Sequence, residues 1–256
     1  MNYQYWLTEQ RKSILILKID RPDCLNALNS STLLELQSIL KTIQNDHKVK
    51  GVIISGAGDK VFVSGGDIDE IKNLDPGSAK VLSSAGNELM HFIEQFPKPI
   101  LAAINGIAYG GGCELAMSCH LRIASKNATF ALPEAKLGIV TGMGGLQRML
   151  QLVGKTKTYQ LALTGEPIGA EEAAKIGLVN FVVSHDQLIS KGIELLEKVV
   201  EQSPVSIRAI IRSINAFYDK SDGFKVEIEE FVKCFEKDDF KEGVKAFKEK
   251  RKPEYQ

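Results

Sequence analysis

The order in which apolar segments follow one another constrains the fold of this chain more than any other feature. Strand-type runs are interleaved with segments of helical character. The runs are "SILILKID" (13–20), "KGVIIS" (50–55), "KVFVSGGD" (60–67), "KPILAAING" (98–106), "LRIAS" (121–125) and "TFAL" (129–132). Strand, strand, helix therefore recurs about three times in roughly 140 residues. This alternation predicts an α/β core.

The first long helix is predicted over residues 32–46. Its apolar residues recur at helical spacing, at Leu33, Leu36, Leu40 and Ile43. Thr32 and Glu35 have the T-x-x-E spacing of a capping box, which predicts a helix start at Thr32.

The strand signal almost disappears after about residue 144. The segments beyond it have helical patterns, and one short strand, "VNFVVS" (179–184), interrupts them. The chain of 256 residues is long enough for one large domain with a helical appendage. We predict a core over residues 1–190 and a helical C-terminal part over residues 191–256.

Charge and cysteine usage exclude several classes of protein. Lys and Arg total 32, as do Asp and Glu, so a net charge of zero gives no reason to expect nucleic acid or a membrane surface as a partner. The four cysteines form no C-x-x-C pair, which favours reduced thiols and a cytoplasmic protein. The first residues contain no apolar signal-peptide core, and no apolar run is long enough to span a membrane.

Common cofactor motifs are incomplete in this sequence. "GAGDKV" (56–61) follows a strand but has Val61 where a dinucleotide fingerprint needs its third glycine. "GKT" (154–156) lies between helical segments, and Met149 replaces the first glycine of a phosphate loop. The four histidines are isolated in sequence, so we predict no metal site and no cofactor.

Two glycine bends have the same design, a strand end followed by glycines and a helix start. One is Ser64-Gly65-Gly66-Asp67, and the other is Gly110-Gly111-Gly112 before "CELAMSC". Glycine at such a place permits a tight turn and also lets a ligand touch the main chain. Two bare amides that converge on one oxygen would form an oxyanion hole, in which one donor contributes roughly 3 kcal/mol.

Four motifs together make a resemblance specific. "VSGGDIDEI", "AINGIAYGGGCELAMSC", "ATFALPEAKLGI" and "GLQRM" follow in the order and spacing of the enoyl-CoA hydratase (crotonase) family, and the resemblance runs from "RPDCLNALN" to "KAFKEKRK". It implies a spiral of ββα units whose C-terminal helices make trimer contacts, usually within hexamers. It also implies that the N–H groups of Gly66 and Gly111 bind the thioester oxygen of an acyl-CoA.

Two glutamates match the acid–base residues of the family's hydratases. Glu114 lies in the first turn after the glycines, and Glu134 lies in "LPEAK". Either alone is also explained as an acidic residue at a helix start. The resemblance implies reversible hydration of a trans-2-enoyl-CoA to a 3-hydroxyacyl-CoA. Glu114 would activate water, Glu134 would supply the Cα proton, and the N–H of Gly142 would hold the water.

The resemblance also implies how the substrate is held and which rival activities remain. Cys24 and Leu25 would contact CoA, together with Gly66, Gly111 and Ile68. The stretch 248–252 is a solvated tail or reaches the CoA phosphates, and CoA itself is part of the substrate. The rivals are a Δ3-Δ2-enoyl-CoA isomerase, an acyl-carrier-protein-linked dehydratase or decarboxylase, and a non-catalytic RNA-binding relative. The two glutamates and the zero net charge disfavour the isomerase, the decarboxylase and the RNA-binding relative.

Three positions depart from the family pattern. His120 stands where an aspartate is common, which puts a structural ion pair in doubt. Thr141 replaces a frequent proline before Gly142, which is expected to loosen the turn that holds the water. Gly66 is often alanine in the family, a difference that leaves its N–H unchanged.

Overall fold

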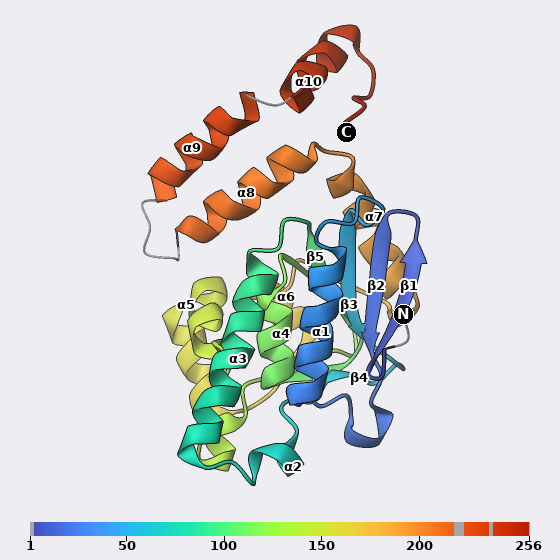
Figure 1. Cartoon of the computed structure of the whole chain (residues 1–256). Coiled ribbons are helices and arrows are strands. Elements are labelled where there is room, and N and C mark those ends of the chain that lie inside the picture. The colour runs from blue at the N-terminus through green and yellow to red at the C-terminus, as the bar shows by residue number, and fades with distance from the viewer. Residues whose placement is uncertain (1–2, 218–222, 236–237, 256) are drawn as a thin grey trace.

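The computed structural model describes residues 3–217, 223–235 and 238–255, and within them two sheets form the core (Figure 1). The larger sheet has the order β1-β2-β3-β5-β7-β10, and the smaller has the order β4-β6-β8-β9. The strands of the larger sheet are β1 (Trp6–Arg11), β2 (Ile14–Ile19), β3 (Gly51–Gly56), β5 (Ile100–Ile104), β7 (Leu121–Ser125) and β10 (Phe181–Val183). Those of the smaller sheet are β4 (Val61–Val63), β6 (Ile107–Tyr109), β8 (Thr129–Ala131) and β9 (Ile168–Gly169).

The strands alternate between the two sheets along the chain. In each of the pairs β3/β4, β5/β6 and β7/β8, the first strand joins the larger sheet and the second joins the smaller. Neighbouring strands within these sets are parallel, whereas β1 with β2 and β8 with β9 are antiparallel. Parallel strands are buried on both faces, which explains their uninterrupted apolar sequences. The predicted α/β core of repeated ββα units is confirmed.

Ten α-helices are described around and beyond the sheets. They are α1 (Ser30–Ile43), α2 (Ile68–Ile71), α3 (Pro76–Glu94), α4 (Gly111–Ser118), α5 (Gly145–Thr164), α6 (Ala170–Lys175), α7 (Leu188–Val200), α8 (Pro204–Ala216), α9 (Gly223–Phe235) and α10 (Asp238–Glu249). Alternate residues of β2 separate two apolar clusters. Leu15 and Leu17 pack in the cluster that includes α1, α3 and α4, whereas Ile14 and Ile16 pack against α7.

The start of α1 differs from the prediction. The helix begins at Ser30, and Asn29 is its N-cap, with Asn29 and Thr32 exchanging side-chain to backbone hydrogen bonds. Glu35 instead accepts hydrogen bonds from the backbone N–H groups of Gln4 and Tyr5. The predicted Thr32–Glu35 capping box is therefore wrong, because a tertiary contact recruits Glu35.

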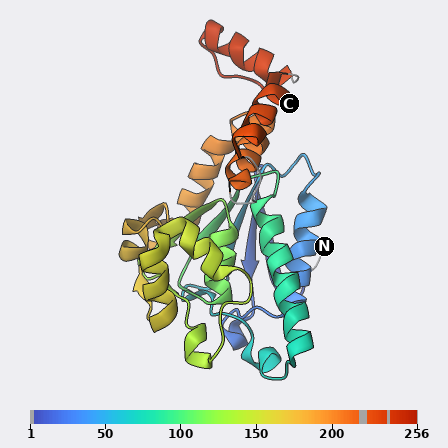
Figure 2. The same ribbon diagram turned by 90° about the vertical axis from the view of Figure 1, so that its left-hand side faces the viewer.

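The C-terminal helices α8, α9 and α10 extend from one end of the core, away from α2 (Figures 1 and 2). Helix α7 packs on the larger sheet through Leu188 and Leu196. The division at residue 190 stays a prediction. Helix α5 is interrupted at Gly154, whose φ of 77° and ψ of 168° are not helical. Within the described ranges, no helix has both the length and the apolar character needed to cross a bilayer.

Candidate active site

Three adjacent parallel strands of the smaller sheet end at the predicted site. β4 leads to Gly66, β6 leads to Gly111, and β8 leads to Glu134. Because the strands run parallel, their carboxyl ends meet at one edge of the sheet. Residues that are distant in sequence are thereby brought together by strand order alone.

Each of the three glycines in the second bend is required for a different structural reason. Gly110 has a positive φ of 47°, and a Cβ there would lie 2.8 Å from Glu134 Oε1. A Cβ on Gly111 would lie 2.8 Å from Met143 Cε and 3.5 Å from the amide nitrogen of Gly66. A Cβ on Gly112 would overlap the carbonyl oxygen of Val63, so this glycine lets α4 approach β4.

The amides of Gly66 and Gly111 lie at the point where the two bends approach each other. Leu28 N–H donates to Gly65 O, and Asp67 N–H donates to Leu28 O, a pattern that leaves the Gly66 N–H outside the bridge. Gly111 is the first residue of α4, so its N–H belongs to the unpaired first turn of the helix. This arrangement is suited to two N–H groups that bind one anionic oxygen.

Glu114 is buried in α4, with only 2% of its surface exposed. Its Oε1 accepts hydrogen bonds from the backbone N–H groups of Met143 at 2.7 Å and Gly145 at 2.8 Å. Burial raises the pKa of Glu114 to about 7, although both amides favour the charged form; the nearby charge of Glu134 raises the pKa further. A carboxyl with a pKa near neutrality is suited to act as a general base.

Glu134 begins a 3-10 helix (Glu134–Leu137) that follows β8. Its Oε1 lies against Gly110, and its buried Oε2 has no hydrogen-bond partner within the described parts of the chain. Burial raises the pKa of Glu134, which favours its protonated form. The site therefore holds two carboxyl groups whose pKa values are raised chiefly by burial.

The segment predicted to contact CoA lies beside the first bend. Leu25 and Asn26 both have positive φ values, 51° and 57°, a conformation that side chains disfavour. Asn26 is buried and holds this turn, because its Oδ1 accepts from Arg21 N–H and its Nδ2 donates to Val61 O. Leu25 is consequently turned outward, with 56% of its surface exposed, while Cys24 is half-buried.

Ile68 is the other exposed apolar side chain beside the first bend, with 53% exposed, at the start of α2. Arg21 and Asp67 form an ion pair at 3.0 Å that ties the CoA segment to the start of this helix. The predicted contacts Cys24, Leu25 and Ile68 therefore border the bend that carries Gly66.

The turn over residues 142–145 contains site residues that the sequence did not reveal. Gly142 lies in this turn, as predicted, but the bonds to Glu114 come from the N–H groups of Met143 and Gly145. Side chains of α3 hold the turn from outside, since Ser83 Oγ and Asn87 Nδ2 donate to Gly142 O at 2.6 and 2.8 Å. Backbone donors and a distant helix have no local sequence signature, so only the folded chain identifies them.

The three departures from the family pattern have structural counterparts. His120 accepts a hydrogen bond from Ile100 N–H at Nδ1, and Nε2 contacts Glu94 O at 3.0 Å. Burial lowers the pKa of His120 to about 4, so its ring is neutral and joins backbone groups rather than an ion pair. A Cβ on Gly66 would meet only the end of the Ile71 side chain, which explains why alanine is tolerable there.

Thr141 does not leave the turn without support. Its hydroxyl accepts a hydrogen bond from Leu146 N–H at 3.2 Å in the first turn of α5. Arg148 adds a second link, because Nη1 donates to Met143 O while Nε and Nη2 bind the two carboxylate oxygens of Glu94. The replacement hydroxyl thus links this turn to the first turn of α5, and the expectation of a looser turn stays a prediction.

Comparison with known proteins agrees with this geometry. A model of the enoyl-CoA hydratase/isomerase family matches residues 9–256. The chain belongs to this family. A protein named short-chain-enoyl-CoA hydratase from Clostridium acetobutylicum is 42% identical over 250 residues, covering 97% of this chain and 96% of the relative. A crotonyl-CoA hydratase from Syntrophomonas wolfei is 39% identical over 257 residues, covering 100% of this chain and 99% of that protein.

Solved structures of family members have the same fold. The crystal structure of an enoyl-CoA hydratase from Bacillus anthracis superimposes with a TM-score of 0.93 at 35% identity, covering 98% of this chain and 99% of the other. A Pseudomonas aeruginosa structure described as DspI gives a TM-score of 0.95 at 32% identity, over 100% and 98% of the two chains. The predicted crotonase-like fold is confirmed.

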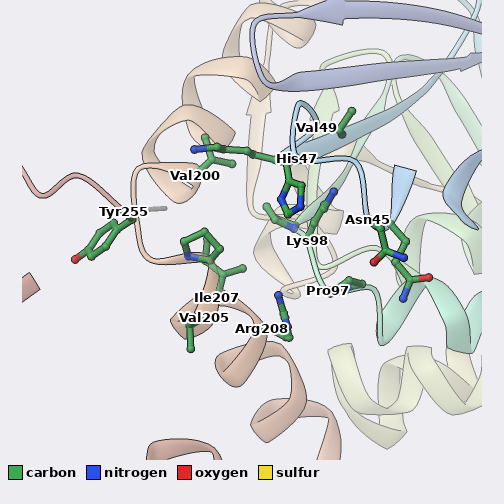
Figure 3. A pocket seen from close by; sticks show the side chains of 14 residues that line it. Asn45, His47, Val49, Pro97, Lys98, Val200, Val205, Ile207, Arg208 and Tyr255 are labelled. Carbon is green, nitrogen blue, oxygen red and sulfur yellow. The ribbon is translucent and has the colours of Figure 1, made fainter. Parts of the chain in front are cut away.

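A separate groove of about 790 Å³ lies between α8 and the amino ends of β3 and β5 in the larger sheet (Figure 3). Its lining includes Lys50 and Pro99, which directly precede β3 and β5, and residues of α8 such as Arg208. The glycine bends follow the carboxyl ends of strands, whereas this groove borders amino ends. It is therefore not part of the site built by Glu114 and Glu134.

Proposed function

We propose that this protein hydrates trans-2-enoyl-CoA thioesters reversibly, giving 3-hydroxyacyl-CoA. The observation that carries the proposal is the placement of buried Glu114 and half-buried Glu134 at the glycine bends that carry the bare amides of Gly66 and Gly111. The full-length similarity to proteins named short-chain-enoyl-CoA hydratase and crotonyl-CoA hydratase supports the same reaction.

The proposed mechanism assigns each group one task. The N–H groups of Gly66 and Gly111 bind the thioester oxygen and stabilise the negative charge that develops as the enolate forms. Ionised Glu114 takes a proton from water, whose oxygen bonds to Cβ while the alkene electrons move toward the thioester oxygen. Protonated Glu134 then donates its proton to Cα, and the enolate collapses to the 3-hydroxyacyl thioester.

After each turnover the two glutamates have exchanged protonation states. Glu114 carries the proton from water and Glu134 has lost its own, so one proton must return before the next cycle. The raised pKa values of both groups make this exchange inexpensive, because neither carboxyl strongly prefers to be ionised. The water-holding role of the Gly142 N–H stays a prediction.

CoA is the part of the substrate by which the protein holds it. The exposed side chains of Leu25 and Ile68, with Cys24 beside them, give the adenine and pantetheine an apolar surface next to the oxyanion amides. Lys248 belongs to α10 and Lys252 follows it in sequence, and α10 lies at the end of the molecule away from α2 (Figure 1), so any contact that these lysines make with CoA phosphates would come from a neighbouring subunit.

We infer a homo-oligomer, a trimer or a hexamer, located in the cytoplasm. Helices α8 and α9 carry exposed apolar side chains, among them Ile210, Ile214, Ile228 and Val232. A contiguous apolar surface of this kind is typical of a protein–protein contact. Sedimentation velocity that gives the mass of a single chain would contradict the oligomer.

Met143 supports a preference for short acyl chains. Its side chain fills the space between Gly111 and Gly86 of α3, where a Cβ on Gly86 would overlap Met143 Cγ. This side chain borders the thioester site, so it competes for room with the carbons beyond Cβ. We expect Met143→Ala to raise the ratio of kcat/KM for C10 over C4 substrates about ten-fold, within the range for small changes in an apolar pocket.

The deciding experiment follows the loss of enoyl-thioester absorbance with C4 to C12 enoyl-CoA substrates. The wild-type protein should be most active on crotonyl-CoA, and Leu34→Ala, which truncates an exposed side chain of α1, should keep that profile. An inactive wild-type protein, or one that only converts 3-enoyl-CoA to 2-enoyl-CoA, would refute the proposal in favour of no catalysis or of an isomerase.

A further inference from the structure

One face of α3 is built around the turn that holds Glu114. Ser83 Oγ and Asn87 Nδ2 both donate to Gly142 O, and between them Gly86 makes room for the Met143 side chain. Asn87 also lies against Gly144, since a Cβ placed there would be 2.9 Å from Asn87 Oδ1. Neither Ser83 nor Asn87 contacts a glutamate of the site directly.

The peptide between Gly142 and Met143 connects this helix to the proposed base. Its C=O accepts from Ser83 and Asn87, while its N–H donates to Glu114 Oε1 at 2.7 Å. A trans peptide is planar, with C=O and N–H pointing in opposite directions, so both bonds lie along one dipole. Hydrogen bonds at one end of such a unit fix its orientation and strengthen the bond at the other.

The second donor to Glu114 is supported differently. Gly145 N–H belongs to the peptide whose carbonyl, Gly144 O, accepts from Arg148 N–H within α5. Helix formation alone therefore orients this donor. The Gly142–Met143 peptide lies outside a helix and depends on the side chains of α3.

We propose that Asn87, together with Ser83, is a positioning residue that fixes the Gly142–Met143 peptide so that its N–H keeps Glu114 able to ionise. This inference rests on the proposed role of Glu114 as the base. The other charged groups that influence Glu114 are Glu134 and Arg148 of α5. Asn87 Oδ1 and Arg148 Nη1 both lie near Gly144, so a test variant at Asn87 must leave the local charge unchanged.

The direction of the effect follows from the charge that the N–H stabilises. A weaker Met143 N–H bond disfavours the ionised carboxylate, so the pKa of Glu114 rises above about 7. A rise of about one unit would lower the ionised fraction at pH 7 roughly five-fold and leave it almost unchanged at pH 9.

The test uses Asn87→Leu, which keeps a similar shape but removes the N–H donors without adding a charge, and the double variant Ser83→Ala/Asn87→Ala. Ser84→Ala, one residue further along α3 and exposed, is the matched control. We expect the acid limb of kcat/KM for crotonyl-CoA to move to higher pH in both test variants, with about a five-fold loss at pH 7 that recovers by pH 9. The control should match the wild-type profile.

A loss of the same size at every pH, accompanied by a lower Tm, would overturn the proposal and leave Asn87 a structural role only. Infrared difference spectra between each protein and its Glu114→Gln counterpart follow ionisation of that carboxyl without catalysis. If the wild-type protein proves inactive but the Glu114 titration is shifted in the variants, this inference stands while the proposed function fails. If the wild-type protein is active but the Glu114 titration is the same in the variants, the proposed function stands while this inference fails.

Discussion

Two regions of the molecule place glutamates in opposite environments. Glu114 is buried at the glycine bends with two backbone amides as partners, and its pKa rises to about 7. Glu194 is exposed on α7 between Lys191 and Lys198, at 2.9 and 2.8 Å, and these two hydrogen-bonded lysines lower its pKa to about 2. The comparison shows that removal from water outweighs neutral hydrogen bonds, whereas full charges dominate where water remains.

The largest effect on kcat should come from replacing either carboxyl group of the candidate active site. Glu114→Gln keeps an oxygen that accepts from Met143 and Gly145 but cannot take a proton from water. Glu134→Gln cannot donate one to Cα. Each change should lower kcat about 10²–10⁴-fold with little change in KM, because general acid–base assistance of that size is lost. Steady-state kinetics with crotonyl-CoA measure it.

Near-normal turnover in either glutamine variant would remove the two-carboxylate mechanism. Glu194→Gln is the matched control, since it makes the same chemical change on an exposed helix. Its kcat and KM should equal those of the wild-type protein.

The next effect concerns stability rather than rate. The folded-state pKa of Glu114 lies above the ordinary value of 4.5, so ionisation opposes folding, and stability is lost as pH rises from about 4.5 to about 7. Glu114→Gln has no charge to bury. It should match the wild-type protein at pH 4 and exceed its free energy of unfolding by up to about 3 kcal/mol at pH 8.

Urea denaturation at fixed protein concentration at both pH values tests this expectation. The difference between variant and wild type cancels the contribution of other titrating groups. A variant that is equally stable or less stable at pH 8 would show that the fold accepts the Glu114 charge without cost. The comparison with Glu194 would then lose its physical basis.

The difference between buried and exposed segments also explains which strands could be predicted from the sequence. Strands β2, β3, β5 and β7 were predicted to within two residues at each end, because buried parallel strands have mostly apolar sequences. Strand β1 was missed because its sequence, WLTEQR, has one buried residue and five exposed ones. Strand β6 was missed because its three residues, IAY, lie between Gly106 and Gly110, and β9 has only two residues.

Candidate site residues also differ in how clearly the sequence indicates them. The glycine bends of Gly66 and Gly111 have a local sequence pattern, whereas the roles of these amides and of Glu114 and Glu134 come from the family resemblance and stay predictions. The other contacts join residues that are far apart in sequence. The amides of Met143 and Gly145 lie 29 and 31 residues from Glu114, and Asn87 lies 55 residues from Gly142. Every residue type except proline supplies a backbone N–H, so such donors have no sequence signature.

The smallest effect should come from replacing the exposed Glu194. The pKa of Glu194 is lowered by its two lysines, so any contribution to stability is present above the unfolded pKa and disappears as pH falls toward about 2. The side chains are solvated, and exposed ion pairs contribute little. Glu194→Gln should leave Tm at pH 7 unchanged within error, and added salt should not separate it from the wild-type protein. A clear drop in Tm at low salt that vanishes at high salt would contradict this expectation. It would show that the ion pairs of Glu194 with Lys191 and Lys198 stabilise the fold measurably, so that surface charge matters as well as burial.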